Sequence, residues 1–335
     1  MDDRDINHDV LDHQLETIRR YLDIKGVSEV WINQPQTVIY TKGGDPVIEQ
    51  DPNITLKYLK NLAKLIATFN ARSINKENPI LTGSLPKGQR VQIVMPPAVE
   101  AGTISFSIRI PAPINKSLDE LDAEGAFDEC KIINNELQDF EHDLVKFKNN
   151  GQIKEFIKLA VTSRRNIIIA GETGSGKTTI AKSMIEHIPK TERLITLESE
   201  NEIDLSTFPN KVHLLYSRSD NGASFITPKK CLEACLRMNP SRIIMAELLG
   251  DESWDFLKSI NTGHAGSITT MHSNGAYETF EQFVSLVKDS PKGAHLDAKY
   301  IHRRLVSTVD VVFFYSKRKL RDIYYEPTRK HEYLD

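Results

Sequence analysis

The stretch Gly171-Glu-Thr-Gly-Ser-Gly-Lys177-Thr178 constrains the fold of this chain more than any other feature, because it matches the complete pattern G-x-x-x-x-G-K-[ST]. An apolar run over residues 167–169 precedes it, and a helical pattern over residues 178–187 follows it. A loop in this position wraps its backbone N–H groups around a phosphate at the N-terminus of a helix. The sequence therefore predicts a phosphate-binding loop on an α/β sheet.

Each position of the loop has an expected role toward a nucleotide. The residues expected to surround it are Gly171, Thr173, Gly174, Ser175, Gly176, Lys177, Thr178 and Thr179. We expect the ammonium group of Lys177 to be exposed in the empty loop and to reach the β- and γ-phosphates. We expect the hydroxyl group of Thr178 to hold Mg²⁺. ATP and Mg²⁺ are thus the expected cofactors.

The second half of the chain has the pattern of an α/β domain with a largely parallel sheet. From Gln152 onward, short apolar runs alternate with helical stretches, which is typical of strands connected by helices. The expected strands cover residues 166–170, 194–197, 212–216, 242–246, 267–270 and 309–315. One helix has clear ends: Thr227 and Pro228 suit its start, and Pro240 lies just beyond its end.

The first part of the chain has the pattern of a smaller α+β domain. Apolar residues at steps of three and four indicate an amphipathic helix: Leu11, Leu15, Ile18 and Leu22. A second helix is expected over residues 55–70, and strands over 30–33, 37–40, 91–95 and 103–110. The chain is thus expected to divide into an N-terminal domain (residues 1–112), a linker (113–150) and a P-loop domain (151–335).

Carboxylates that directly follow two expected strands are candidates to act beside the loop. Glu247 and Glu198 hold this position, where the carboxyl ends of parallel strands meet a nucleotide. A P-loop enzyme needs acidic groups for Mg²⁺ and for the attacking water. Either Glu247 or Glu198 is expected to orient that water, and Glu198 is also expected at the metal. Spacing alone does not separate Glu198 from Glu200, Glu202 and Asp204 as the residue that faces Mg²⁺.

Composition and charge exclude several classes of protein. Hydrophobic residues make up 39% of the chain and charged residues 27%, as in a chain that folds around a core. A net charge of −3 does not favour stable nucleic-acid binding. The polar start is no signal peptide, and no apolar run reaches the roughly 18 residues that cross a bilayer. We expect a cytoplasmic protein without zinc, since Cys231 and Cys235 have no second ligand pair nearby.

Four segments, in this order, resemble the motifs of the hexameric ATPases of type IV secretion systems, relatives of the type II secretion and type IV pilus ATPases. They are the loop at 171–179 and the segments 196–202, 235–248 and 262–272, which resemble the family's Walker A loop, Asp box, Walker B region and His box. The resemblance implies a RecA-like P-loop ATPase domain and a homohexamer that hydrolyses ATP. It also implies other secretion-system components as partners, at the inner membrane, with which the ATPase associates peripherally.

The resemblance leaves the exported cargo open. Substrate export, pilus assembly and conjugative transfer of DNA all fit the family, and the sequence does not distinguish a protein cargo from DNA.

Two N-terminal segments, residues 88–94 and 105–111, resemble the type IV branch of this family. In that branch the N-terminal domain lends arginines to the nucleotide, which here implies Arg90 and Arg109. The alternation of the expected strand agrees, because it places Arg109 on the face opposite Ile108. Whether this domain packs on its own subunit or on a neighbouring one stays open.

Two histidines, His264 and His272, lie eight residues apart, a spacing that does not suit two zinc ligands on one helix. A neutral imidazole can hydrogen-bond to a phosphate oxygen and respond to its loss. The resemblance implies that His272 is the sensor of the γ-phosphate.

The chain departs from the family pattern at Ser199, Ala246 and Leu249, where aspartate, glycine and arginine are usual. These departures leave the rate of hydrolysis open. Two other functions also stay open: a nucleic-acid translocase that shares the P-loop, and a nucleotide-binding scaffold without turnover. The basic turn of Lys317, Arg318 and Lys319 is expected to be a solvated hairpin.

Overall fold

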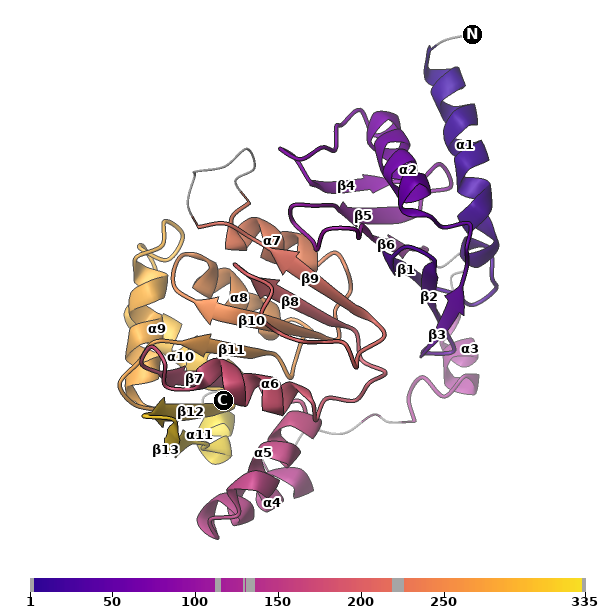
Figure 1. Cartoon of the computed structure of the whole chain (residues 1–335). Helices are drawn as coiled ribbons and strands as arrows, with labels where there is room; N and C mark the ends of the chain where they lie inside the picture. The colour runs from indigo at the N-terminus through magenta and orange to yellow at the C-terminus, as the bar shows by residue number, and fades with distance from the viewer. Residues whose placement is uncertain (1–2, 112–115, 129, 131–135, 219–225, 333–335) are drawn as a thin grey trace.

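The computed structural model of the chain describes residues 3–111, 116–128, 130, 136–218 and 226–332. Figure 1 shows two bodies side by side: an N-terminal domain in indigo and purple, and a C-terminal domain in pink, orange and yellow. Each body has its own sheet with helices around it, so the α/β class predicted from the sequence is confirmed. Within the described ranges, no helix combines the length and the apolar character needed to cross a membrane.

The N-terminal domain is an antiparallel sheet with two helices on one face. In spatial order its strands are β3 (Asp45–Gln50), β2 (Thr37–Lys42), β1 (Glu29–Gln34), β6 (Ser105–Arg109), β5 (Arg90–Val94) and β4 (Ile80–Ser84). Helices α1 (Asp3–Leu22) and α2 (Leu56–Phe69) pack their apolar stripes on this sheet. The sequence predicts both helices and four of these strands, but not β3 and β4, which lack a fully buried face.

Strand β6 has the alternation that its sequence predicts. Phe106 and Ile108 are buried in one cluster with the helices, whereas Ser105 and Ser107 point to the opposite face. That second face is not solvated, because Ser107 is only 3% exposed and lies at the junction with the C-terminal domain.

The C-terminal domain is built on a seven-stranded sheet. In spatial order its strands are β13 (Lys319–Tyr324), β12 (Val311–Ser316), β7 (Ile167–Gly171), β11 (Ile268–Met271), β10 (Arg242–Leu248), β8 (Leu194–Glu198) and β9 (Lys211–Leu215). All are parallel except β13, which forms a hairpin with β12. The six strands predicted here are confirmed, and their carboxyl ends meet at one edge of the sheet.

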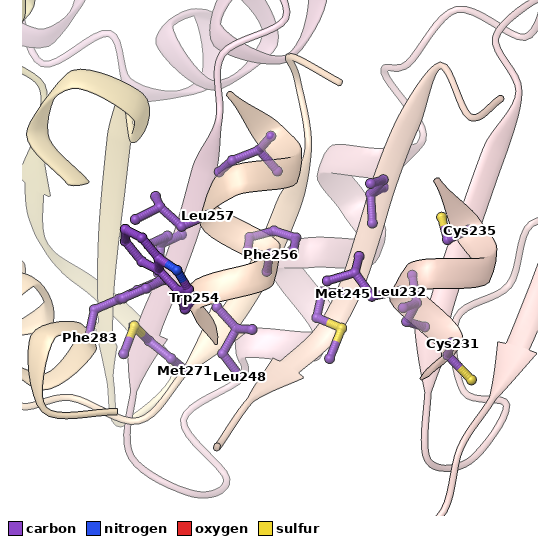
Figure 2. Packing of buried hydrophobic residues seen from close by; sticks show 14 of the residues in the cluster. Cys231, Leu232, Cys235, Met245, Leu248, Trp254, Phe256, Leu257, Met271 and Phe283 are labelled. Atoms are coloured by element: carbon purple, nitrogen blue, oxygen red, sulfur yellow. The ribbon is translucent and has the colours of Figure 1, made fainter. Parts of the chain in front are cut away.

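Helices cover both faces of this sheet. On one face lie α7 (Pro228–Cys235), α8 (Glu252–Ile260), α9 (Glu278–Lys288) and α10 (Ala298–Thr308); on the other lie α5 (Ile153–Thr162) and α6 (Lys177–Ile185). The chain ends with the short α11 (Pro327–Glu332). Figure 2 shows part of the first layer, where Trp254 and Phe256 of α8 lie in one buried cluster with Met245 of β10. Cys231 and Cys235 are free thiols buried in the same cluster.

Two helices fall within the described part of the predicted linker, residues 113–150: α3 (Leu118–Ala123) and α4 (Asp139–Asn149). Helix α4 packs against α5, and its Leu144 is buried in one cluster with Phe156. The last part of this segment therefore belongs to the C-terminal domain by its packing.

A buried arginine joins the two domains. Arg193, directly before β8, donates hydrogen bonds to Ser107 (3.1 Å) and Asn33 (3.1 Å) of the N-terminal domain. Its guanidinium also lies 5.0 Å from the ring centroid of Trp31. The domains pair along the edge strand β9 as well, since the carbonyl of Ala98 accepts a hydrogen bond from the last backbone N–H of β9 at 2.9 Å. These contacts fix the N-terminal sheet against the β8–β9 edge.

Candidate active site

The phosphate-binding loop connects the end of β7 to the start of α6. Gly176 caps the helix with a left-handed backbone (φ 99°), which a residue with a side chain rarely adopts. Gly171 is the last residue of β7. A Cβ atom added to it would lie 2.2 Å from the carbonyl oxygen of Tyr315, so only glycine fits there. The pattern of glycines thus gives the strand–loop–helix geometry that the sequence predicts, with the helix N-terminus open to an anion.

Lys177 does not lie where we expected it. Its side chain is buried rather than exposed, and its ammonium donates hydrogen bonds to the carbonyls of Gly171 (2.8 Å) and Glu172 (3.0 Å). The prediction is wrong because the backbone carbonyls of the loop itself accept hydrogen bonds from the ammonium group. Burial lowers the pKa of Lys177, while the charges of Glu247 and Glu172 oppose this shift. The ammonium is thus held inside the loop, among groups that a phosphate can replace.

A cavity of about 960 Å³ opens in front of this loop, at the carboxyl edge of the sheet. The loop and the start of α6 form one wall, from Thr173 to Thr179. The ends of β8, β10 and β11 form the opposite wall. The three departures from the family pattern, Ser199, Ala246 and Leu249, all lie in this second wall.

Glu247 and His272 meet in this cavity. Glu247 belongs to β10 and His272 follows β11, and the two strands are parallel neighbours. The Nε2 atom of His272 lies 2.8 Å from Oε1 of Glu247, so the imidazole and the carboxylate are in direct contact. Both side chains remain partly exposed to the cavity, at 43% and 33% respectively. The pairing unites the two residues that the sequence analysis had named separately.

Glu198 is held differently from Glu247. Its carboxylate is fully buried at the end of β8 and accepts hydrogen bonds from Thr196, from His213 of β9 (3.1 Å) and from the backbone N–H groups of Glu202 (2.9 Å) and Ile203 (2.8 Å). Burial alone would raise the pKa of Glu198, but these hydrogen bonds together hold it below its usual range. Both carboxylate oxygens are therefore already occupied.

The loop has the donors that a nucleotide with Mg²⁺ requires. The Oγ atom of Ser175 is buried without a hydrogen-bond partner among the described residues. The side chain of Thr178 is exposed at the first turn of α6 and lies in the cavity wall. An unpartnered buried hydroxyl and an accessible one beside a helix N-terminus suit phosphate and a hard cation. The residues present thus fit the expected cofactors.

Other expected residues lie away from this cavity within the same chain. Arg90 and Arg109 pair across β5 and β6, and Nε of Arg109 lies 3.7 Å from Oε1 of Glu29. Neither arginine contributes to the cavity wall. His264 also lies elsewhere: its Nδ1 is 3.1 Å from the carbonyl of Pro240, and burial lowers its pKa.

Two arginines that the sequence analysis did not assign to the site lie in the cavity wall, Arg218 and Arg318. Arg218 follows β9 and donates to the buried Glu252 (2.8 Å) and to the carbonyl of Glu247 (3.3 Å). Arg318 lies in the basic turn between β12 and β13, so the predicted solvated hairpin is confirmed, and its exposed turn also borders the cavity. The sequence carries no signal for either position, because the order of strands in the sheet decides which turns face the loop.

The fold and the loop define a P-loop ATPase domain of the RecA-like type, joined to a smaller α+β domain. The family described as "Type II/IV secretion system protein" matches residues 123–315. The type IV secretion system protein VirB11 of Bartonella quintana is 39% identical, covering 95% of this chain and 93% of the relative. The type IV secretion system protein PtlH of Bordetella pertussis is 34% identical, covering 92% and 91%.

A solved structure matches the whole chain. The crystal structure of the VirB11 ATPase from the Brucella suis type IV secretion system, in complex with sulphate, has a TM-score of 0.94 and 34% identity. The match covers 100% of this chain and 99% of the other. The chain therefore belongs to the type II/IV secretion system protein family, within the type IV secretion ATPases. The resemblance inferred from the four motifs is confirmed.

Proposed function

We propose that this chain hydrolyses ATP, with Mg²⁺, to power a type IV secretion system. The observation that supports this most is the Glu247–His272 pair, which faces the phosphate-binding loop across one cavity. A scaffold that only binds nucleotide needs the loop, but it does not need a carboxylate and an imidazole opposite it. A P-loop enzyme does need them, because catalysis of phosphoryl transfer depends on positioned groups around the γ-phosphate.

The loop residues from Gly171 to Thr179 hold the phosphates. Lys177 exchanges the carbonyls of Gly171 and Glu172 for the β- and γ-phosphate oxygens, so its charge is at the right place before the nucleotide arrives. Thr178 would hold Mg²⁺, and the ion would neutralise charge on the phosphate oxygens. Glu198 would hold the metal only if its carboxylate gave up one of the hydrogen bonds that it accepts.

Glu247 takes the role of orienting the attacking water. Its carboxylate is exposed to the cavity, whereas both oxygens of Glu198 are engaged. His272 contacts Glu247 and so limits where the carboxylate can lie, while the imidazole borders the same cavity and can respond when the γ-phosphate leaves. The Glu247–His272 contact is present with Ala246 and Leu249 beside it in the cavity wall.

We assign Arg90 and Arg109 to the nucleotide of a neighbouring subunit. Neither residue lines the cavity of its own chain, and both lie on an accessible end of the N-terminal sheet. A ring of six identical subunits would bring this end of one copy to the cavity of the next through a head-to-tail interface. We further propose that such a ring works in the cytoplasm at the inner membrane, with other secretion-system components as partners.

The domain division follows the same proposal. An N-terminal domain (residues 1–112), a linker (113–150) and an ATPase domain (151–335) allow hydrolysis to move one domain against the other. Helix α4 moves with the ATPase domain, because it packs on α5.

Replacement of Lys177 by alanine tests the function directly. Purified Lys177→Ala protein should release phosphate from ATP at least about 100-fold more slowly, because the loop loses its one fixed positive charge on the transferred group. The fold should remain, as thermal unfolding would verify. Phosphate release at the wild-type rate would exclude this loop as the hydrolytic site. Strong stimulation of the wild type by single-stranded DNA would instead favour a nucleic-acid translocase.

A further inference from the structure

The hairpin of β12 and β13 packs directly against the phosphate-binding loop. The Oγ atom of Ser316 donates to Oε1 of Glu172 at 2.8 Å, and the carbonyl of Tyr315 fills the space beside Gly171. The Cα and Cγ atoms of Arg318 each lie 3.9 Å from the position that a Cβ of Gly176 would take. The hairpin and the loop therefore form one packed unit, and Arg318 lies in the wall of the cavity.

The turn of this hairpin has a backbone that its residues disfavour. Lys317 and Arg318 both have positive φ angles, 50° and 59°. Because Ser316 pairs with Lys319, these two residues form a two-residue turn of type I′, for which Asn-Gly is the favoured sequence. Lys-Arg at this position is strained. Strain of this kind beside a functional cavity points to a role for a side chain that glycine could not supply.

The order of the strands determines which end of a nucleotide the hairpin faces. Glu247 belongs to β10 and His272 directly follows β11, and both strands lie on one side of β7. Strand β12 is the neighbour of β7 on the other side. If Glu247 and His272 face the γ-phosphate, then the hairpin faces the opposite end of the phosphate chain, where the α-phosphate joins the nucleoside.

The two arginines of the cavity wall, Arg218 and Arg318, differ in whether they form an ion pair. Arg218 is committed to Glu252, at 2.8 Å. Arg318 makes no ion pair with any residue in the described part of the chain. Its guanidinium is therefore available to an anionic ligand, and a guanidinium can donate two parallel hydrogen bonds to phosphate oxygens.

We propose that Arg318 is a nucleotide-binding residue that contacts the α-phosphate from the β12–β13 hairpin. The assignment rests on the proposed nucleotide site and extends it to the side of the loop away from Glu247. The α-phosphate is present in ATP and in ADP, so Arg318 stabilises both complexes. In this it differs from an arginine on the γ-phosphate, which loses its partner after hydrolysis.

A change that relieves the strain of the turn while removing the arginine tests the proposal. The double variant Lys317→Asn, Arg318→Gly has the sequence that a type I′ turn favours, so it should unfold at the wild-type temperature or higher. Calorimetric titration should nevertheless give about 10-fold weaker binding of ADP and of a non-hydrolysable ATP analogue alike. Arg321→Gln is the control: Arg321 is exposed on the same hairpin, is no part of the cavity wall, and its variant should bind both ligands like the wild type.

Three outcomes would contradict parts of this scheme. Binding of both ligands within about twofold of the Arg321→Gln control would mean that Arg318 does not contact the nucleotide. Loss of affinity for the ATP analogue alone would place Arg318 at the γ-phosphate and overturn the assignment to the α-phosphate. The proposed nucleotide site itself is tested by a different measurement. If Lys177→Ala released phosphate as fast as the wild type, that site would be wrong.

Discussion

At the scale of single residues, Nε2 of His272 lies 2.8 Å from Oε1 of Glu247, which brings an imidazole and a carboxylate together in the cavity beside the phosphate-binding loop. Only one oxygen of Glu247 lies in this contact, so the other oxygen remains available to water. Glu198, by contrast, has no free oxygen, because His213, Thr196 and two backbone N–H groups occupy both. Glu247 and Glu198, which the sequence alone does not rank, thus differ in whether a carboxylate oxygen is available to water.

This difference predicts unequal effects of two matched substitutions. Glu247→Gln should still bind ATP but should lower turnover by a factor of about 100 or more, because an amide cannot accept the proton of the water. Glu198→Gln should lower the melting temperature, since an amide cannot accept all the hydrogen bonds that the carboxylate accepts, and it should reduce turnover less than Glu247→Gln does. Phosphate-release rates and thermal unfolding of both variants measure this. Nearly normal turnover of Glu247→Gln with an inactive, stable Glu198→Gln would reverse the two roles.

A second residue-scale prediction concerns Arg218. Its partner Glu252 is 1% exposed and also accepts from the backbone N–H of Leu249, so the pair holds the segment that follows Glu247. Arg218→Met should destabilise the protein by about 1–3 kcal/mol, a value reduced from that of a fully buried pair because Arg218 is 32% exposed. The double variant Arg218→Met, Glu252→Gln should recover much of this loss in urea unfolding. Stability of Arg218→Met equal to that of the wild type would mean that the ion pair has no structural role.

At the scale of elements, the junction between the domains depends on charges buried between the N-terminal sheet and the β8–β9 edge. Burial raises the pKa of Glu29 to about 7, although Arg109 and Arg193 act in the opposite direction. The folded state therefore binds a proton at Glu29 more tightly than the unfolded state does. Stability contributed by this site is full below pH 4.5 and is lost as the pH rises toward 7.

Glu29→Gln should remove this dependence. Relative to the wild type, the variant should gain up to about 3 kcal/mol of unfolding free energy between pH 4.5 and pH 8, because the amide stays neutral throughout. Urea unfolding of both proteins across that range measures the difference. A difference that is constant with pH would show that Glu29 does not titrate in this interval.

Much of the element structure could be predicted from local sequence. The cap of α7 by Thr227, which accepts a hydrogen bond from the N–H of Lys230, follows from residue types alone. Strand β3 could not be predicted, because its residues are largely exposed and only pairing with β2 defines it. The position of the basic turn beside the loop could not be predicted either, because it requires β12 to be the neighbour of β7.

At the scale of the whole molecule, the placement of Arg90 and Arg109 outside their own cavity makes the proposed ring testable. Arg109→Ala and Lys177→Ala proteins should each be nearly inactive alone, since each lacks one part of every site. When the two are mixed and allowed to exchange subunits, about a quarter of the sites should combine an intact loop with an intact neighbouring arginine. ATPase activity should therefore appear on mixing.

The alternative arrangement gives a different result. If Arg109 served the loop of its own chain, no mixed ring would contain a complete site, and activity would not appear. An unmixed Arg109→Ala protein with full activity would exclude any role for this arginine in hydrolysis. Sedimentation of the mixed proteins before and after subunit exchange shows whether they remain assembled, which is the control for this experiment.

The phosphate-binding loop, the two domains and the acids at the strand ends can be predicted from local sequence, because each depends on neighbours along the chain: glycine spacing, apolar periodicity and the residue that follows a strand. Three relations arise only when the chain folds: His272 contacts Glu247, His213 engages Glu198, and Arg318 lies in the cavity wall while Arg109 does not. These relations depend on which strands pair in the sheet and on how the domains dock. Burial and strand order are set by packing across the whole molecule, and no local pattern encodes them.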